Sequence, residues 1–224
     1  MASFFTLTLD TTGPQGVSIV LNSGATFAST REVTATLATT DGTTTGYQMK
    51  LWGDVDPTVN TSIQALEASS AWIAFNASQA VTLSNIDGFK TVNVKIRDDV
   101  FNESAVASDS ITLDTTVPVI TLSAPDVTRV SKVAGKRVAS ATFSTDTALV
   151  AYEVRVVPSQ SSLQSSGTVI PTTNGSTNMS GGAVAANATV NITIDGRDLE
   201  LASAGDGNKI VKVFGQEASG AWSV

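Results

Sequence analysis

Four segments of this 224-residue chain occur twice and in the same order. The sequence Leu-Asp-Thr-Thr at residues 9–12 returns at residues 113–116, and the last pair of segments, at 90–104 and 209–223, matches without gaps. A repeat with a period of roughly 100 residues indicates two modules built to the same plan. We therefore predict two domains, residues 1–114 and 115–224, rather than one large body.

The repeated segments have the pattern of half-buried strands. Tyr47-Gln48-Met49-Lys50-Leu51 and its counterpart at 152–156 alternate apolar and polar residues, as a strand with one buried face requires. Turn-forming residues separate short runs of this kind, which is typical of a β-sandwich. We expect strands near residues 17–21, 32–38, 46–52, 72–75, 80–83, 90–97 and 105–113, and again near 119–122, 136–143, 150–157, 168–170, 188–194 and 209–214.

The spacing of the repeats changes towards the end of the chain. The second copy has 14 more residues than the first between its third and last shared strands. We place this insertion in residues 158–186, a stretch rich in Ser, Gly, Asn and Thr that indicates long loops. Long helices are not expected.

Composition excludes several kinds of chemistry. The chain has no Cys and no His, so it cannot form disulfides, thiolate metal sites, a Ser-His-Asp triad or a His general base. A formal net charge of -7 opposes binding to a phosphate backbone, which needs clustered Lys and Arg. We predict a protein that is not an enzyme, needs no cofactor and does not bind nucleic acid.

One stretch resembles a known family. Residues 87–104 read DGFKTVNVKIRDDVFNES and are followed by DSITLDTT at 109–116, which is similar to the bacterial Ig-like repeats. In that family a strand, a tight turn written Ala-Gly-Asn, a return strand and an Asp-Thr-Thr-x-Pro junction follow one another. Here Phe101 replaces the turn glycine, and Ala221 replaces the asparagine in the second copy. The resemblance implies an all-β fold of two tandem immunoglobulin-like β-sandwich domains.

The two copies differ at their ends. Residues 6–10, Thr-Leu-Thr-Leu-Asp, repeat the motif Ser-Ile-Thr-Leu-Asp that closes the first copy at 110–114, although they precede both copies. The second copy shows no evident final strand. We therefore expect an extra N-terminal strand whose apolar residues Phe4, Phe5, Leu7 and Leu9 are candidates for an interface. Either residues 3–9 add to the sheet edge of another subunit or of a different protein, or they pair within their own chain, as the first strand of the first domain or by folding back.

Acidic residues offer a weak metal candidate. Asp54 and Asp56 lie two positions apart at the end of a strand, and oxygen ligands of this kind can bind calcium. Asp is equally common in turns, and no EF-hand pattern is present, so turn chemistry is the preferred interpretation. The same pairs do not suggest the cleft that a glycosidase needs.

Aromatic residues allow two interpretations. Trp72, Phe75 and Trp222 can form an exposed platform for a glycan or a protein, or they can fill the core. We favour the core for Trp52 and Trp72, and an interface for Trp222.

Ig-like repeats of this family occur in bacterial surface proteins and in tailed-bacteriophage virions, where they decorate capsids and tails or form neck and baseplate parts. The N-terminal residues lack the features of a secretory signal, and no apolar stretch is long enough to span a membrane, so membrane insertion is not expected. We expect a virion structural protein that contacts other virion proteins or copies of itself. The alternative is an adhesion module at the bacterial cell surface that binds a host glycan or protein.

Overall fold

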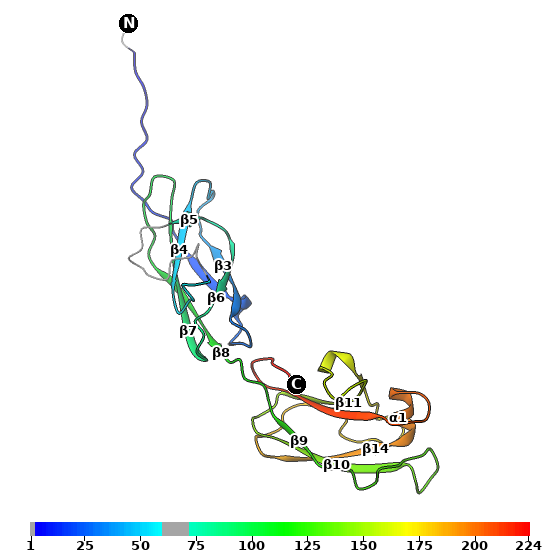
Figure 1. Cartoon of the computed structure of the whole chain (residues 1–224). Coiled ribbons are helices and arrows are strands. Elements are labelled where there is room, and N and C mark those ends of the chain that lie inside the picture. Colours follow the sequence, from blue (N-terminus) through cyan, green and yellow to red (C-terminus); the bar gives the residue numbers. More distant parts are fainter. Residues whose placement is uncertain (1–2, 60–71) are drawn as a thin grey trace. The chain divides into compact units, whose positions relative to one another are not determined.

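The computed structural model describes residues 3–59 and 72–224, which belong to two compact units, residues 1–115 and 116–224 (Figure 1). β-Strands are the main regular secondary structure of the described residues, which also contain one short α-helix, α1 (Gly196–Ala202), and two 3-10 turns, η1 (Asn22–Gly24) and η2 (Gln164–Ser166). The all-β prediction is therefore confirmed.

The first unit contains two sheets that face each other. The smaller sheet has the strand order β1-β3-β6, and the larger has the order β2-β8-β7-β4-β5. All neighbouring strands are antiparallel except β2 and β8, which are parallel. The strands are β1 (Ser18–Leu21), β2 (Phe27–Ala28), β3 (Glu32–Ala38), β4 (Gln48–Gly53), β5 (Ile73–Ala74), β6 (Ser78–Thr82), β7 (Gly88–Arg97) and β8 (Ala107–Leu113).

Alternation along the strands builds the core of the first unit. In β3 the side chains of Val33, Ala35 and Leu37 are buried, while the residues between them are exposed. Every second residue of β7 is buried in the same way, and both sheets contribute to a single apolar cluster. Two sheets that share one core form a β-sandwich.

The second unit repeats this arrangement with fewer strands. One sheet has the order β14-β10-β9; in the other, β11 pairs with β15 along one edge and with the short β12 and β13 along its opposite edge. The ring of Phe143 packs on that of Tyr152 at a centroid distance of 5.0 Å and joins the two sheets. The strands are β9 (Ile120–Leu122), β10 (Val138–Thr145), β11 (Ala151–Val157), β12 (Thr168–Val169), β13 (Ser180–Gly181), β14 (Thr189–Asp195) and β15 (Ile210–Gln216).

Each strand expected from the repeats within the two copies is found, with small differences at the ends. Two short strands, β2 and β13, and the helix α1 were not predicted. The extra length of the second copy is also divided differently from the prediction. The stretch between β4 and β6 has 24 residues, and its equivalent between β11 and β14 has 31. The connection from β6 to β7 has 5 residues, whereas its equivalent from β14 to β15 has 14. Much of the insertion is therefore the α1 segment.

The expected extra N-terminal strand is not a strand in this structure. Residues 3–17 have no strand assignment, and no strand of the described residues pairs with them. An extended segment becomes a strand only when its backbone groups bond to a neighbour. Neither the first unit nor the second provides that neighbour within the chain as described.

The last hairpin of each unit has the same hydrogen bonds. In the first unit the Ser104 N–H donates to the carbonyl of Ile96 at 2.8 Å, and the Ile96 N–H donates to Ser104 Oγ at 3.0 Å. In the second unit the Ser223 N–H donates to the carbonyl of Gly215 at 2.8 Å, and the Gly215 N–H donates to Ser223 Oγ at 3.1 Å. The duplication seen in the sequence therefore extends to individual backbone contacts.

The turn between these hairpin strands needs a left-handed residue. Phe101 has φ +70° and its counterpart Gly220 has φ +88°. A left-handed conformation costs a residue with a Cβ roughly 1–2 kcal/mol, whereas glycine adopts it freely. The first unit tolerates Phe101 there, and its ring lies over the guanidinium of Arg97 at 4.4 Å.

Replacing Gly220 separates backbone strain from crowding. A Cβ at Gly220 would meet no atom within 4 Å, so Gly220→Ala is expected to lower the unfolding free energy of the second unit by about 1 kcal/mol through the positive φ alone. Gly42→Ala is the control, because Gly42 also has open space but no positive φ. Urea denaturation measures both, and equal effects of the two substitutions would refute the assignment.

Candidate functional site

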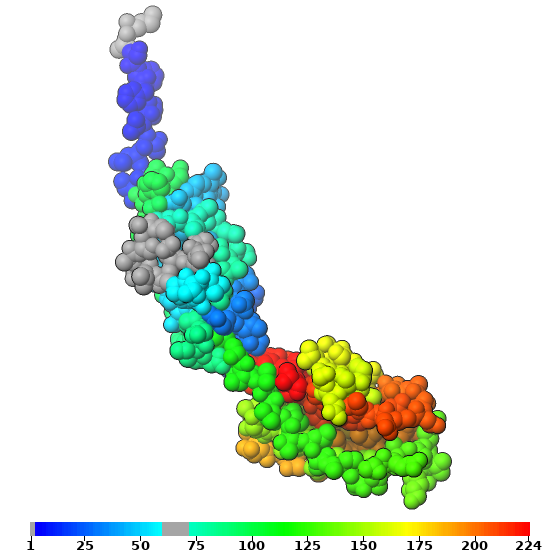
Figure 2. Space-filling model, viewed as in Figure 1, coloured from blue at the N-terminus to red at the C-terminus, as the bar shows by residue number. Residues whose placement is uncertain are grey.

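The N-terminal segment, residues 3–9, is the most exposed apolar segment among the described residues and is called the arm below. The exposed fractions of Phe4, Phe5, Leu7 and Leu9 are 93%, 84%, 80% and 86%. Figures 1 and 2 show the arm extended and clear of the two sheets of the first unit. The interface candidates predicted from the sequence thus lie on a surface that is accessible to a partner.

The arm is attached to the first unit at its C-terminal end. The Asn102 side chain donates from Nδ2 to the Asp10 carbonyl at 3.3 Å. Gly13 lies so close to the same hairpin that a Cβ there would come within 2.3 Å of the Glu103 carbonyl oxygen. These contacts fix where the chain leaves the sandwich and leave residues 3–9 beyond it.

The second unit carries an open sheet edge. Along one side β15 pairs with β11 over its whole length, from Ile210 opposite Val157 to Gln216 opposite Ala151. Along the other side the described residues supply only the end of the hairpin, where Trp222 bridges to Gln216 and Ser223 bonds to Gly215. From residue 214 back to residue 210 this edge has no neighbouring strand among the described residues. Trp222, predicted as an interface residue, lies half-buried at the end of the open edge.

The two acidic calcium candidates act as turn acceptors. Asp54 Oδ2 accepts the Thr91 N–H at 2.9 Å. Asp56 accepts the Thr58 N–H at 2.9 Å and forms an ion pair with Arg31, and the hydrogen bonds from Thr58 and Arg31 lower the pKa of Asp56 to about 2. No group of three acidic, His or Cys side chains suited to a metal ion occurs in residues 3–59 and 72–224, and calcium binding stays a prediction.

The aromatic residues of the first unit do not form a bare platform. Trp52 is buried, and Phe75 packs against the core. Trp72 is half-buried, with Arg97 over its ring at 4.6 Å and Lys50 at 5.0 Å. Trp52 is buried on the face of β4 opposite the core residues Met49 and Leu51, beside Lys50. Neither Trp52 nor Trp72 therefore belongs to the apolar cluster of the first unit, where both were expected from the sequence.

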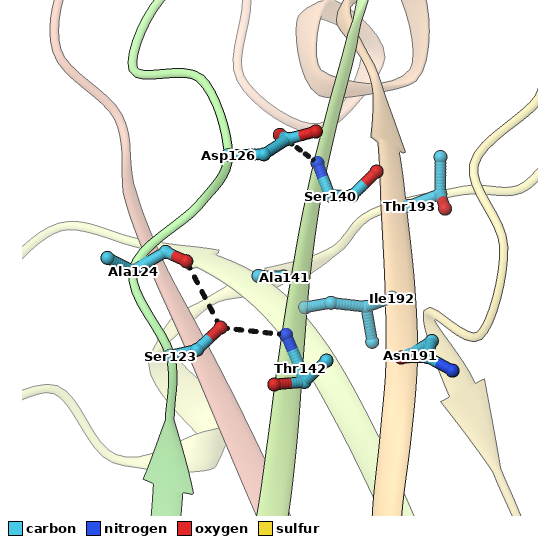
Figure 3. A pocket seen from close by; sticks show the side chains of 9 residues that line it. All are labelled: Ser123, Ala124, Asp126, Ser140, Ala141, Thr142, Asn191, Ile192 and Thr193. Atoms are coloured by element: carbon cyan, nitrogen blue, oxygen red, sulfur yellow. Dashed lines mark hydrogen bonds between the residues drawn. The ribbon is translucent and has the colours of Figure 1, made fainter.

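A shallow hollow lies on the β9-β10-β14 sheet (Figure 3). Two of its polar side chains bind the local backbone. Asp126 Oδ1 accepts the Ser140 N–H at 2.6 Å, and Ser123 Oγ accepts the Thr142 N–H at 2.9 Å while donating to the Ala124 carbonyl at 3.1 Å. The Asp126 and Ser123 side chains are therefore already bound to the protein itself.

A buried acidic network in the second unit was not anticipated from the sequence. Asp198, on α1, has no exposed surface and accepts hydrogen bonds from Ser176 N–H at 2.9 Å, Thr173 Oγ1 at 2.9 Å and Asn174 Nδ2 at 2.8 Å. Burial alone would raise the pKa of Asp198, but these bonds outweigh it and lower the pKa to about 2. The carboxylate holds the 173–176 loop against the helix.

Asp195 is the second member of this network. It caps α1 by accepting the Arg197 N–H at 2.9 Å, and its side chain forms ion pairs with Arg137 at 3.1 Å and Arg197 at 3.0 Å. The hydrogen bond from Arg197 lowers the pKa of Asp195, against the effect of burial. Both carboxylates are ionised and bound to donors, which is the arrangement of groups that stabilise the fold. A general acid would instead need a raised pKa and access to substrate.

The sequence contains a local signal for the helix α1, but none for the contacts that join Asp198 to the 173–176 loop. Asp195, with Asp198 and the sequence Leu-Glu-Leu-Ala after it, has the pattern of a helix N-terminus. Gly196 weakens this pattern, because glycine has a low helix propensity. That Gly is required, since a Cβ there would lie 2.3 Å from the Ser131 carbonyl oxygen. No spacing rule links Asp198 to Ser and Asn residues more than 20 positions earlier.

Comparison with known proteins identifies no family and no activity for this chain. No family model and no curated protein matches the chain. Among solved structures, the chitinase ChiA74 from Bacillus thuringiensis aligns with a TM-score of 0.32 and 10% identity over 92% of this chain and 30% of its own. The native conformation of E. coli alpha-2-macroglobulin aligns with a TM-score of 0.28 and 11% identity over 90% of this chain and 16% of its own. The chain thus spans under a third of either protein, and similarity this low assigns no activity.

In the described part of the chain, no helix has the length and apolar character needed to cross a membrane.

Breaking the Asp198 network should destabilise the second unit. Asp198→Asn places an amide among hydrogen-bond donors, and we expect a loss of about 2–4 kcal/mol of unfolding free energy at pH 7. Because the folded pKa is depressed to about 2 from 3.8, the stabilisation is complete above pH 4 and is lost as pH falls towards 2. Urea unfolding at several pH values measures this difference.

Glu200→Gln is the matched control on the same helix. Glu200 is 37% exposed and lies 3.9 Å from Lys132, so its removal should change stability by less than about 0.5 kcal/mol. An Asp198→Asn protein as stable as the control at pH 7 would contradict the structural role of this carboxylate.

Proposed function

We propose that this chain consists of two tandem immunoglobulin-like domains of the bacterial Ig-like repeat type and serves as a non-enzymatic structural or accessory protein of a bacteriophage virion. It acts by docking to other proteins, as a capsid or tail decoration or as a neck or baseplate component.

The form of the two units supports the domain assignment. Each is a sandwich of two sheets over its own core. The family-like stretch occupies β7, the following turn and the start of the return strand, and Phe101 takes the left-handed conformation that the family's glycine would provide. The Asp-Thr-Thr-x-Pro segment at 114–118 lies where the first unit passes into the second.

The observation that carries the docking role is the exposed apolar arm. Four large apolar side chains in seven residues, each at least 80% exposed, are costly to leave in water and prone to aggregation. An assembled particle provides a partner that covers such a segment. An open edge on β15 adds a second surface of the same kind.

The chemistry of the side chains supports a role without catalysis. The sequence has neither His nor Cys, and the most perturbed buried carboxylate, Asp198, is bound by backbone and side-chain donors rather than facing a cleft. Such a residue serves packing, not proton transfer.

The proposal predicts a fixed number of copies in purified particles. Quantitative mass spectrometry of virions through successive gradient purifications should give a constant ratio of this chain to the major capsid or tail subunit, and imaging of the particles should locate it at symmetry-related positions. A ratio that falls towards zero with purification would contradict the structural role. Saturable binding of the free protein to a cell-surface glycan would favour adhesion instead.

A further inference from the structure

The outer edge of β15 reproduces the edge of β7 that β8 covers in the first unit. Gly88, the first residue of β7, and Gly207, which precedes β15, both have φ +124°. Lys90 Nζ donates to Ser84 Oγ at 2.9 Å, and the equivalent Lys209 Nζ donates to Ser203 Oγ at 3.2 Å. Together with the matching hairpin bonds, these contacts show that β15 has the shape to receive a strand like β8.

That strand is absent from residues 116–224. The backbone N–H and C=O groups of successive residues in a strand point to opposite edges. The Gly215 C=O accepts the Ser223 N–H on the outer edge of β15, so the N–H and C=O groups of Val213 and Val211 point to that same edge. Val211 is only half-buried, whereas its counterpart Val92, beneath β8, has no exposed surface. The second sandwich is thus open where the first is closed.

The arm reproduces β8. Residues 6–10 are Thr-Leu-Thr-Leu-Asp, and residues 110–114, which include the end of β8, are Ser-Ile-Thr-Leu-Asp. Ile111 and Leu113 point into the core of the first unit and are each 1% exposed. Leu7 and Leu9 hold the same two positions in the arm but lie in solvent. The chain therefore carries a free strand and a vacant edge that match each other.

We infer that the arm of one copy binds along the outer edge of β15 in a second copy, antiparallel to it, as a strand equivalent to β8. The register of β7 with β8 sets the pairing. Leu9 lies opposite Gly207, Thr8 opposite Asn208 and Leu7 opposite Lys209. Leu7 and Leu9 then enter the core of the second unit.

One further contact fits this register. In the first unit the Thr115 N–H and Oγ1 donate to the Asp87 carboxylate at 3.1 Å and 2.9 Å. The equivalent pair across the proposed interface is Thr11 of one copy and Asp206 of the other, and both residues are exposed. The complementarity thus continues beyond the strand into the turn.

The inference rests on the proposed docking function and names its partner as a second copy of this chain. Each copy provides one donor strand and one acceptor edge, which are different surfaces. Contacts of this head-to-tail kind produce a closed ring or an open filament rather than a symmetric dimer.

Cross-linking tests the partner and the register together. The natural chain has no cysteine, so a double variant Thr8→Cys/Asn208→Cys carries only the two introduced thiols. The corresponding pair in the first unit, Thr112 and Phe89, is not hydrogen-bonded, and such pairs have Cα atoms about 4.5 Å apart, within disulfide range. We expect a ladder of covalent multimers of the full-length chain on a non-reducing gel after mild oxidation.

The control variant is Thr8→Cys/Lys212→Cys. Lys212 lies on the same face of β15 but four residues out of register, about 13 Å away, and should give little cross-linking. Equal multimer formation by both variants would overturn the register. A cross-linked monomer would mean that the arm folds back on its own chain, and no disulfide at all would overturn the pairing.

Sedimentation velocity of single variants provides a second readout. Leu7→Glu puts a charge on the inward face of the arm and should weaken self-association at least tenfold, whereas Thr8→Glu, on the outward face, should leave it within about twofold of wild type. Leu7 is 80% exposed in the single chain, so the substitution does not disturb folding of either unit. Equal association of the two variants would overturn the inference.

These experiments use the isolated chain, whereas the proposed function is tested in particles. A chain found at constant copy number in virions but without cross-links would refute only the strand exchange. Cross-linked multimers of a chain that is absent from virions would refute only the virion role.

Discussion

Backbone N–H and C=O groups lie along both edges of every β-strand, and each must find a partner or face water. In the first unit β7 meets this requirement on both sides, with β4 on one edge and β8 on the other. Among the described residues, β15 meets it over its whole length on one side only, through β11, and on the other side only at the hairpin end. The exposed arm, the half-buried Val211 and the proposed contact between copies all follow from this difference.

The duplicated sequence predicted the strands well because alternation is a local property. The range 32–38 expected from the pattern coincides with β3, and the hairpin that ends at Ser104 has the same bonds as the one that ends at Ser223. β2 and β13 were missed, whereas the equally short β5 and β12 were found because they lie in apolar runs at 72–75 and 168–170. The positions of β2 and β13 depend on β8 and β11, which lie far away in the sequence.

The candidate site was foreseen only in part. The arm could be singled out because residues 6–10 repeat, ahead of both copies, the motif that closes the first copy, and no strand of the described residues pairs with residues 3–9. The Asp198 network could not be predicted, because its donors at 173–176 reach it only through the folded loop. The hydrogen bonds from this loop lower the pKa of Asp198 against the effect of burial, and sequence spacing reveals none of them.

The central claim is that the outer edge of β15 is paired by the arm of another copy, and amide hydrogen exchange measures that pairing directly. At high protein concentration the Val211 and Val213 amides of the full-length chain should be protected like those of Val92 and Val94, and they should exchange at least tenfold faster in a chain that lacks residues 2–9. Equal exchange rates at these two valines with and without the arm would contradict the account.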